Sequence, residues 1–197
     1  MEAVIVDSGG ANLASLQFAF ERLGARTRVT SDVREIADAP RVVLPGVGSA
    51  ADAMQRLRRS ELVAVLPTLR QPVLGICLGM QLLFEHSAEG ATTCLGILAG
   101  TVRRLEANGE RPVPHMGWNQ LAHSRQDPLL EQIEPGEYFY FVHSYAAPVS
   151  EATVARAEYG ETISAVVRRD NFWGTQFHPE RSASAGARLL HNFLRLT

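Results

Sequence analysis

The chain has 197 residues, of which 46% are hydrophobic and 20% are charged, and its formal net charge is −2. This composition is ordinary for a globular protein, and the length predicts a single domain over residues 1–197. So small a net charge gives no reason to expect nucleic acid or an anionic membrane as a partner. The N-terminus lacks the basic residues that open a targeting segment, and no apolar run approaches the ~20 residues that span a bilayer. The two cysteines favour a reducing compartment. We therefore expect a cytoplasmic protein.

Strand and helix signals alternate along the first half of the chain. Short strand-like runs, apolar except at residues 27–30, predict strands at residues 3–6, 27–30, 41–44 and 72–76. Apolar residues at helical spacing predict helices at residues 13–23 and 50–69, with Pro67 disturbing the last turn, and a helix that opens at residue 80. This alternation indicates right-handed βαβ crossovers. It predicts an α/β fold with a mostly parallel central sheet and flanking helices.

The second half of the chain has a different pattern. Short strand-like runs occur at residues 101–103, 138–142, 153–155, 163–167 and 172–177. Turn signals such as Asn108-Gly109 and Pro135-Gly136 separate them, and a final helix is predicted at residues 183–194. This half is expected to add an antiparallel or mixed extension to the sheet.

The most informative segment is Gly75-Ile76-Cys77-Leu78-Gly79, which places a thiol between two glycines. The run before it predicts a buried strand and the run after it predicts a helix, so Cys77 lies on a sharp strand-to-helix turn. This is the cysteine form of the nucleophile elbow, in which small neighbours let a strained turn expose the nucleophile. A helix N-terminus would also favour the thiolate. Because cysteine is among the most buried residue types, the segment alone leaves a nucleophile and a structural thiol equally open.

A thiol nucleophile needs a base, and the base needs a group that orients it. Among the six histidines, His178 has a carboxylate at a suitable spacing, in His178-Pro179-Glu180. Pro179 biases His178 toward extended backbone, where residues i and i+2 project to the same side, so Glu180 can accept the imidazole N–H. Alone, this motif is more often a surface turn. Because it follows a predicted buried strand and accompanies the elbow, it predicts a triad of Cys77, His178 and Glu180.

Acyl transfer also requires N–H donors directed at the developing oxyanion. The amide of Leu78, directly after the thiol, is one candidate. Pro45-Gly46-Val47-Gly48 follows a predicted strand, and its glycines permit positive φ and close approach of backbone N–H groups to a ligand. This segment is therefore a candidate source of the second donor, although taken alone it is more simply read as a turn.

Together, these segments resemble the class I, triad-type glutamine amidotransferases. The two strongest signatures are Gly-Ile-Cys-Leu-Gly-Met-Gln-Leu-Leu-Phe at residues 75–84 and Gln-Phe-His-Pro-Glu-Arg-Ser at residues 176–182. Within that family the chain resembles the glutaminase subunits of imidazole glycerol phosphate synthases. That closer resemblance rests on Pro-Gly-Val-Gly at residues 45–48, His-Met-Gly-Trp-Asn at 115–119, Tyr-Phe-Val-His-Ser-Tyr at 140–145 and the opening motif at 6–13. It covers essentially the whole chain and implies a flavodoxin-like class I glutamine amidotransferase fold.

The resemblance implies hydrolysis of glutamine to glutamate and ammonia. In the family mechanism, Cys77 attacks the side-chain amide to form a γ-glutamyl thioester, His178 acts as base and then protonates the departing ammonia, and Glu180 orients His178. The oxyanion donors would come from Val47, Gly48 and Leu78. The polar residues expected to hold the glutamine are Gln81, Glu89, Ser144 and Tyr145. No metal and no organic cofactor are implied.

The resemblance also implies a partner. Ammonia would pass to a separate (β/α)₈-barrel cyclase subunit, in a heterodimer that serves histidine biosynthesis. The residues that match the family's partner-facing positions are His115, Met116, Gly117, Trp118, Asn119 and Arg181. Apart from the resemblance, Trp118 would be read as ordinary core packing. The isolated chain is expected to have little glutaminase activity and to gain it on binding a liganded partner.

Two alternatives remain. The chain could donate ammonia in another amidotransferase, of the pyridoxal phosphate or anthranilate synthase type, although the glycine loop and the segment at residues 115–119 argue against this. It could also be a non-catalytic interaction subunit of the same fold, which an intact triad disfavours.

Overall fold

The computed structural model describes residues 1–8, 13–107 and 111–197 of the chain. The middle of the opening motif at residues 6–13 and the predicted Asn108-Gly109 turn lie outside these ranges.

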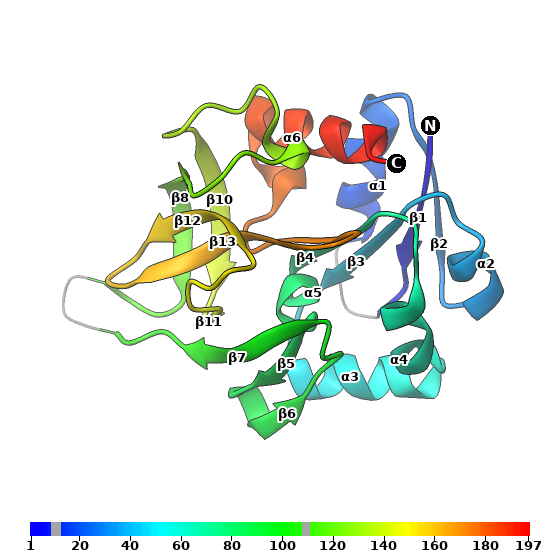
Figure 1. The fold of residues 1–197 in the computed structure, drawn as a ribbon, viewed down its shortest axis with the longest axis horizontal. Helices are drawn as coiled ribbons and strands as arrows, with labels where there is room; N and C mark the ends of the chain where they lie inside the picture. The colour runs from blue at the N-terminus through cyan, green and yellow to red at the C-terminus, as the bar shows by residue number, and fades with distance from the viewer. Residues whose placement is uncertain (9–12, 108–110) are drawn as a thin grey trace.

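An eight-stranded mixed sheet forms the centre of the molecule (Figure 1). Five parallel strands make up one side of it, because the chain returns through helices between most of them. In spatial order these strands are β2 (Arg26–Thr30), β1 (Glu2–Val6), β3 (Val42–Gly46), β4 (Val73–Cys77) and β14 (Phe172–Thr175). The sheet continues through antiparallel strands: β13 (Thr162–Arg169), β12 (Thr153–Glu158) and β9 (Ala122–His123).

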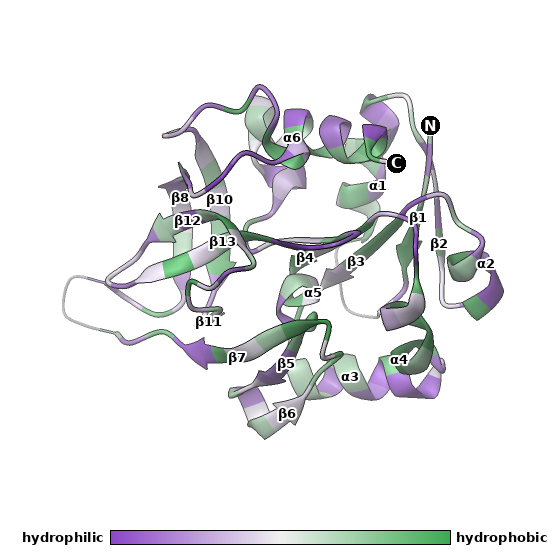
Figure 2. Ribbon diagram, viewed as in Figure 1, coloured by the Kyte–Doolittle hydropathy of each residue, from purple (hydrophilic) through white to green (hydrophobic). Residues whose placement is uncertain are grey.

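Helices cover both faces of the parallel strands (Figure 1). On one face, α1 (Leu13–Arg22) and α6 (Ala183–Arg195) pack against side chains such as Ile5. On the other, α3 (Ala50–Arg59) and α4 (Leu62–Val65) pack against side chains such as Val4, while α2 (Val33–Ala37) lies near the edge of the sheet. Adjacent residues of β1 therefore enter different cores. Strands buried on both faces explain the continuous apolar runs in this half, which Figure 2 colours as hydrophobic.

Two smaller sheets extend the second half of the molecule. The strands β8 (His115–Gln120) and β10 (Tyr138–His143) form an antiparallel ribbon. The other small sheet contains β11 (Tyr145–Ala146), β7 (Leu98–Arg104), β5 (Phe84–Ser87) and β6 (Thr92–Thr93). The remaining short elements are 3₁₀ turns: η1 (Leu66–Thr68), η2 (Glu89–Ala91), η3 (Pro128–Leu130) and η4 (Pro179–Arg181). The predicted α/β fold with a mixed extension is thus confirmed.

Some predicted elements differ from the structure. The helix expected over residues 50–69 ends at Arg59, because Glu61 adopts a left-handed φ of 59° before α4 begins. The helix expected from residue 80 is instead the four-residue α5 (Leu78–Gln81), and Phe84 already belongs to β5. The strand β8 and the short helix α2 were not among the predicted elements.

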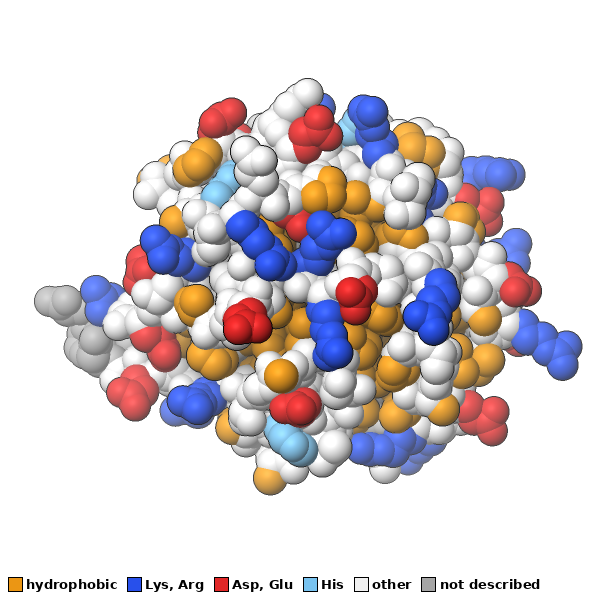
Figure 3. Space-filling model, in the orientation of Figure 1, with side chains coloured by type: hydrophobic (Ala, Val, Ile, Leu, Met, Phe, Trp, Pro, Cys, Tyr) orange, Lys and Arg blue, Asp and Glu red, His pale blue; other side chains and the backbone are white. Residues whose placement is uncertain are grey.

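Charges of both signs are interspersed on the face drawn in Figure 3, where no single-sign patch forms. Within residues 1–8, 13–107 and 111–197, no helix is both long and apolar enough to cross a bilayer.

Candidate active site

Cys77 ends strand β4, in the middle of the sheet, and directly precedes α5. Its backbone has φ 54° and ψ −112°, a conformation that costs a non-glycine residue about 1–3 kcal/mol. Strain of this kind is characteristic of a nucleophile elbow. The four-residue α5 has only a weak dipole, so the helix contributes less to the thiolate than the sequence predicted.

The glycines on either side of Cys77 let three backbone segments meet. A Cβ on Gly79 would collide with the carbonyl oxygen of Leu44 in β3, and one on Gly75 would lie 2.7 Å from the carbonyl oxygen of Gly79. Larger residues at these two positions would push α5 away from β3 and β4. The glycines therefore fix the position of Cys77 beside the end of β3.

His178 reaches the same edge of the sheet from the neighbouring strand. The strand β14 runs parallel to β4, with Thr175 paired with Ile76, so the residues after both strands lie close together. His178 is extended, with φ −98° and ψ 98°, as the following proline predicted. Glu180 lies in the 3₁₀ turn η4 rather than in extended backbone, yet its Oε1 is 2.8 Å from His178 Nδ1. Both side chains are about nine-tenths buried.

The charge on His178 depends on both of its neighbours. Burial lowers the pKa of the imidazole, but hydrogen bonds to Cys77 and Glu180 and the negative charges of these groups outweigh it and raise the pKa to about 10. The ring is therefore protonated at neutral pH. This arrangement can hold a thiolate–imidazolium pair, with the remaining imidazole nitrogen bonded to the carboxylate.

A cavity of about 310 Å³ opens in front of the thiol. Cys77 and His178 line it together with every residue predicted for the oxyanion hole and for glutamine binding: Val47, Gly48, Leu78, Gln81, Glu89, Ser144 and Tyr145. These residues come from five separate segments of the chain. Their convergence on one cavity supplies a nucleophile, an acid–base group and several polar side chains within reach of one small ligand.

Two of the polar residues in this cavity are held by hydrogen bonds. The Nε2 of Gln81 donates to the carbonyl oxygen of Tyr145 at 2.8 Å and to Oε1 of Gln176 at 2.9 Å. The Oε2 of Glu89 accepts from the backbone N–H of Ala50 at 2.7 Å, at the start of α3. These bonds restrict both side chains before any ligand binds.

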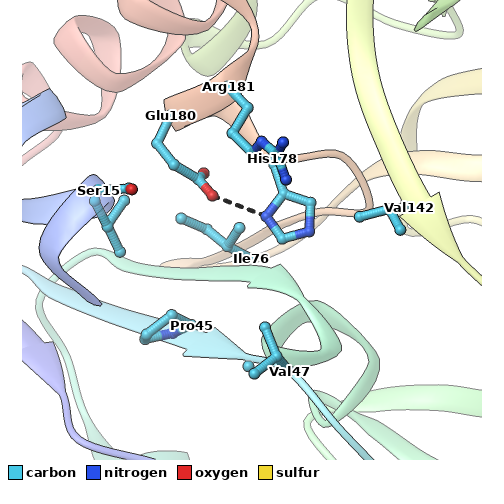
Figure 4. A pocket seen from close by; sticks show the side chains of 10 residues that line it. Ser15, Pro45, Val47, Ile76, Val142, His178, Glu180 and Arg181 are labelled. Atoms are coloured by element: carbon cyan, nitrogen blue, oxygen red, sulfur yellow. Dashed lines mark hydrogen bonds and ion pairs between the residues drawn. The ribbon is translucent and has the colours of Figure 1, made fainter. Parts of the chain in front are cut away.

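A second cavity, of about 370 Å³, lies on the other side of His178 (Figure 4). Val47, Val142 and His178 line both cavities, so the two cavities are adjacent. Glu180 and Arg181 line only the second cavity, as does Ser15 of α1.

Three further residues lie at the site without a role predicted from the sequence. Val142 and His143 of β10 line the glutamine-sized cavity, and Gln176 lies against the sulfur, with its Nε2 3.8 Å from Cys77 Sγ. Gln176 belongs to the signature at residues 176–182, but its complete burial and its contact with the sulfur are seen only in the structure.

The ribbon of β8 and β10 carries most of the residues predicted to face a partner. Met116 and Trp118 project outward and are 67% and 52% exposed, and Arg181 places its guanidinium over the ring of Tyr140, 4.6 Å from the centroid. Gly117 and Asn119 are half-buried. His115 differs from the prediction, because its side chain is buried, with 3% exposed. Strand alternation explains this difference: residues 115, 117 and 119 face the core side of the ribbon.

His115 instead belongs to a buried hydrogen-bonded chain behind the cavity. His143 Nδ1 donates to the carbonyl oxygen of Tyr145 at 2.8 Å, so its Nε2 accepts from His115 Nδ1 at 3.0 Å. Burial lowers the pKa of His143 to about 3 and that of His115 to about 4, and both rings are therefore neutral. His115 is also stacked between the rings of Phe141 and Tyr159, at centroid distances of 4.9 and 3.9 Å. This chain of hydrogen bonds holds the carbonyl oxygen of Tyr145 in place.

The ion pair at the site leads to a prediction about titration. In Cys77→Ala we expect the pKa of His178 to fall from about 10 by roughly 1–3 units, because the hydrogen bond and the charge of the sulfur are lost while burial remains. An NMR titration of the histidine ring measures the change, and Cys94→Ala serves as the matched control. An unchanged titration in Cys77→Ala would rule out the pair.

Comparisons with known proteins show the family of the chain. The family model described as "Glutamine amidotransferase class-I" matches residues 4–196. The chain is 51% identical over 195 residues to "Imidazole glycerol phosphate synthase subunit HisH" of Xylella fastidiosa (strain Temecula1), covering 99% of this chain and 98% of the relative. It is also 51% identical over 197 residues to the protein of the same name from Idiomarina loihiensis, covering 100% and 99% of the two chains.

Solved structures share the fold at much lower identity. A crystal structure described as a glutamine amidotransferase matches with a TM-score of 0.75 and 18% identity, over 98% of this chain and 96% of that one. A putative GMP synthase subunit from Thermoplasma acidophilum matches with a TM-score of 0.74 and 17% identity, over 98% and 92% of the two chains. With the family model matching nearly the whole length, this chain belongs to the class-I glutamine amidotransferases.

Proposed function

We propose that this chain is the glutaminase subunit of an imidazole glycerol phosphate synthase, which hydrolyses glutamine and passes the ammonia to a cyclase subunit in the cytoplasm. The observation that carries the proposal is the cavity that brings Cys77 and His178 together with the predicted oxyanion and glutamine-binding residues. The relatives at 51% identity over the whole chain support the choice of synthase over other ammonia-donating enzymes. The bond between His178 and Glu180 argues against a non-catalytic subunit.

In the first half of the proposed reaction, the Cys77 thiolate attacks the side-chain carbonyl carbon of glutamine. Backbone N–H groups of Leu78 and of the loop at Val47 and Gly48 stabilise the oxyanion that develops. The C–N bond then breaks, and ammonia leaves with the proton that His178 donates. A raised pKa suits this step, because the imidazole is already protonated when the nitrogen needs a proton.

The second half needs His178 as a base. Once Cys77 is acylated, the sulfur no longer carries the negative charge that helped to raise the pKa of the imidazole, while burial still lowers it. His178 is then able to take a proton from water, which attacks the thioester and releases glutamate. The proton stays on the imidazole and the sulfur leaves as thiolate, so the starting state is restored. One histidine thus serves as acid and as base, because the charge of its neighbour changes between the two steps.

For the partner surface we propose the outward face of the β8–β10 ribbon, with Arg181 beside it. Residues on this face include Trp118 and Tyr140, whose rings meet edge to face at a centroid distance of 6.0 Å, and the 54% exposed Tyr138. Exposed aromatic residues next to an arginine are typical of protein interfaces. Because Val142 of the same ribbon and Arg181 line the second cavity, ammonia leaving through that cavity would emerge beside the partner. A (β/α)₈-barrel cyclase is the partner that the proposal requires.

Trp118→Ala is expected to weaken binding of the cyclase subunit about 30-fold, since removal of a central aromatic anchor costs about 2 kcal/mol. Titration calorimetry with the purified cyclase measures the affinity. Val149→Ala is the matched control, because Val149 is 48% exposed but lies outside the β8–β10 ribbon. Equal affinities of the two variants would exclude the ribbon as the interface.

The function is tested by reconstitution. The chain is co-purified with candidate barrel subunits from the same genome, and glutamine hydrolysis is measured with and without the ribonucleotide that the cyclase uses. We expect a stable complex, with low hydrolysis by the isolated chain and strong stimulation by partner and nucleotide together. Failure of every barrel subunit to bind, or full activity of the chain alone, would contradict the proposal.

A further inference from the structure

Gln176 lies beside the proposed nucleophile but outside the proposed triad. It follows β14 directly, and the pairing of Thr175 with Ile76 in the next strand places it alongside Cys77. Its side chain is fully buried, and its backbone N–H donates to the carbonyl oxygen of Ala165 at 2.9 Å. The side-chain Nε2 is 3.8 Å from Cys77 Sγ, within hydrogen-bonding distance for sulfur.

The orientation of this amide is determined by its neighbours, beginning at a backbone carbonyl group. The carbonyl oxygen of Tyr145 accepts but cannot donate, so the group of Gln81 that lies 2.8 Å from it must be the NH₂. The same NH₂ is 2.9 Å from the amide of Gln176, which must therefore present its oxygen to Gln81. The NH₂ of Gln176 is then left facing the sulfur. His143 Nδ1 also donates to the Tyr145 oxygen, at 2.8 Å, and this second bond holds in place the carbonyl group from which the orientation of both amides follows.

The same chain of bonds has a consequence for the cavity. Because the NH₂ of Gln81 is used by Tyr145 and Gln176, its oxygen remains to accept a hydrogen bond from a ligand. One amide pair thus presents an acceptor to the proposed glutamine site and a donor to the thiol.

We propose that Gln176 is a positioning residue that donates a hydrogen bond to the Cys77 thiolate, stabilising the charged form and fixing the direction of the sulfur. The proposal rests on Cys77 being the nucleophile. A neutral thiol gains little from such a donor, whereas a bond to a charged acceptor is about twice as strong. The short helix α5 stabilises the thiolate only weakly. The stabilisation must therefore come mainly from the two side chains that donate to the sulfur, Gln176 and His178.

The test is the pH dependence of alkylation of Cys77 by iodoacetamide, measured on the full chain in a Cys94→Ala background. Gln176→Met keeps the length of the side chain but cannot donate. We expect the pH of half-maximal alkylation to rise by about one unit and the rate at neutral pH to fall about tenfold. Gln176→Asn keeps the amide but withdraws it from the sulfur by one methylene, so its alkylation profile is expected to shift in the same direction. This variant replaces Gln176→Met in the test if the methionine variant does not fold.

Thr175→Val is the matched control. Thr175 is fully buried one residue earlier, and its hydroxyl donates to the carbonyl oxygen of Phe177, 3.2 Å away, rather than to the sulfur. We expect its alkylation profile to follow that of the parent, with melting temperatures recorded for all variants. Profiles of Gln176→Met and Gln176→Asn that match the control would overturn the role of Gln176. A parent in which Cys77 resists iodoacetamide at every pH where the chain stays folded would instead count against Cys77 as the nucleophile.

Discussion

Replacing Cys77 with alanine is expected to reduce glutamine-dependent synthesis by the reconstituted complex at least about 10⁴-fold, while synthesis from added ammonia stays close to that of the parent. The reason is that Cys94, the other cysteine of the chain, is not among the described residues that line the cavity, whereas the cyclase reaction needs only ammonia. Steady-state assays with glutamine and with an ammonium salt as alternative nitrogen sources measure both rates on one preparation. The contrast between the two sources separates loss of the nucleophile from loss of the complex.

Cys94→Ala is the control for this experiment. Cys94 is also buried, but burial raises the pKa of its thiol to about 11, with Arg58 opposing the effect in part, so it is protonated at neutral pH. We expect Cys94→Ala to keep glutamine-dependent synthesis. If Cys77→Ala still uses glutamine, or if the loss follows Cys94, the assignment of the nucleophile is wrong.

Glu180→Gln is expected to lower glutamine turnover by about 10²–10⁴-fold with little loss of folded protein. The glutamine oxygen is still able to accept from His178 Nδ1, where the carboxylate accepts at 2.8 Å, so the ring keeps a partner. The negative charge that helps to hold the pKa of His178 near 10 is lost, and less imidazolium is available to protonate ammonia. Comparison of kcat for glutamine in the parent and variant complexes, with melting temperatures beside them, measures the effect.

Glu158→Gln provides the comparison for a carboxylate outside the site. Its Oε1 accepts from the hydroxyl of Thr162 at the surface, so its replacement is expected to leave turnover unchanged. A Glu180→Gln complex that turns over glutamine as fast as Glu158→Gln would mean that the carboxylate does not assist His178.

Most of the parallel half of the fold was predictable because its inner strands are buried on both faces, unlike the edge strand β2. Runs such as Val42–Leu44 are then apolar throughout and stand out from the helices between them. The end of α3 was not predictable, since Glu61 carries no signal for a left-handed φ. The early end of α5 was also not predictable, because it results from a distant contact. Phe84 pairs with Leu98 in β7, and no pattern around residue 84 reveals this pairing.

β8 escaped prediction for another physical reason. In this strand the polar His115 is buried, whereas the apolar Met116 and Trp118 are exposed. An ordinary surface strand has the opposite arrangement, with apolar residues buried and polar residues exposed. The same reversal places His115 in the interior rather than at the predicted interface. Exposed aromatic residues on this ribbon are accounted for by the proposed partner surface.

The candidate triad could be predicted because two of its members are neighbours in the chain and the third lies in a glycine-flanked turn. Gln176 could not be assigned in this way, since its contact with Cys77 arises from the pairing of β14 with β4, about a hundred residues apart in sequence. His143 acts on the cavity through the Tyr145 carbonyl group, which likewise depends on the folded backbone. Local motifs therefore predicted Cys77, His178 and the orienting Glu180, while Gln176 and His143, whose contacts depend on strand pairing, required the structure.

As the nucleophile of the proposed reaction, Cys77 becomes a γ-glutamyl thioester during turnover. Acid quenching of the complex with its nucleotide and saturating glutamine, followed by mass spectrometry of the proteolysed chain, detects this adduct. We expect the peptide that contains Cys77 to carry the mass of a γ-glutamyl group, and the peptide that contains Cys94 to remain unmodified. A complex that hydrolyses glutamine at its full rate with no adduct on Cys77, under conditions that preserve thioesters, would contradict the account.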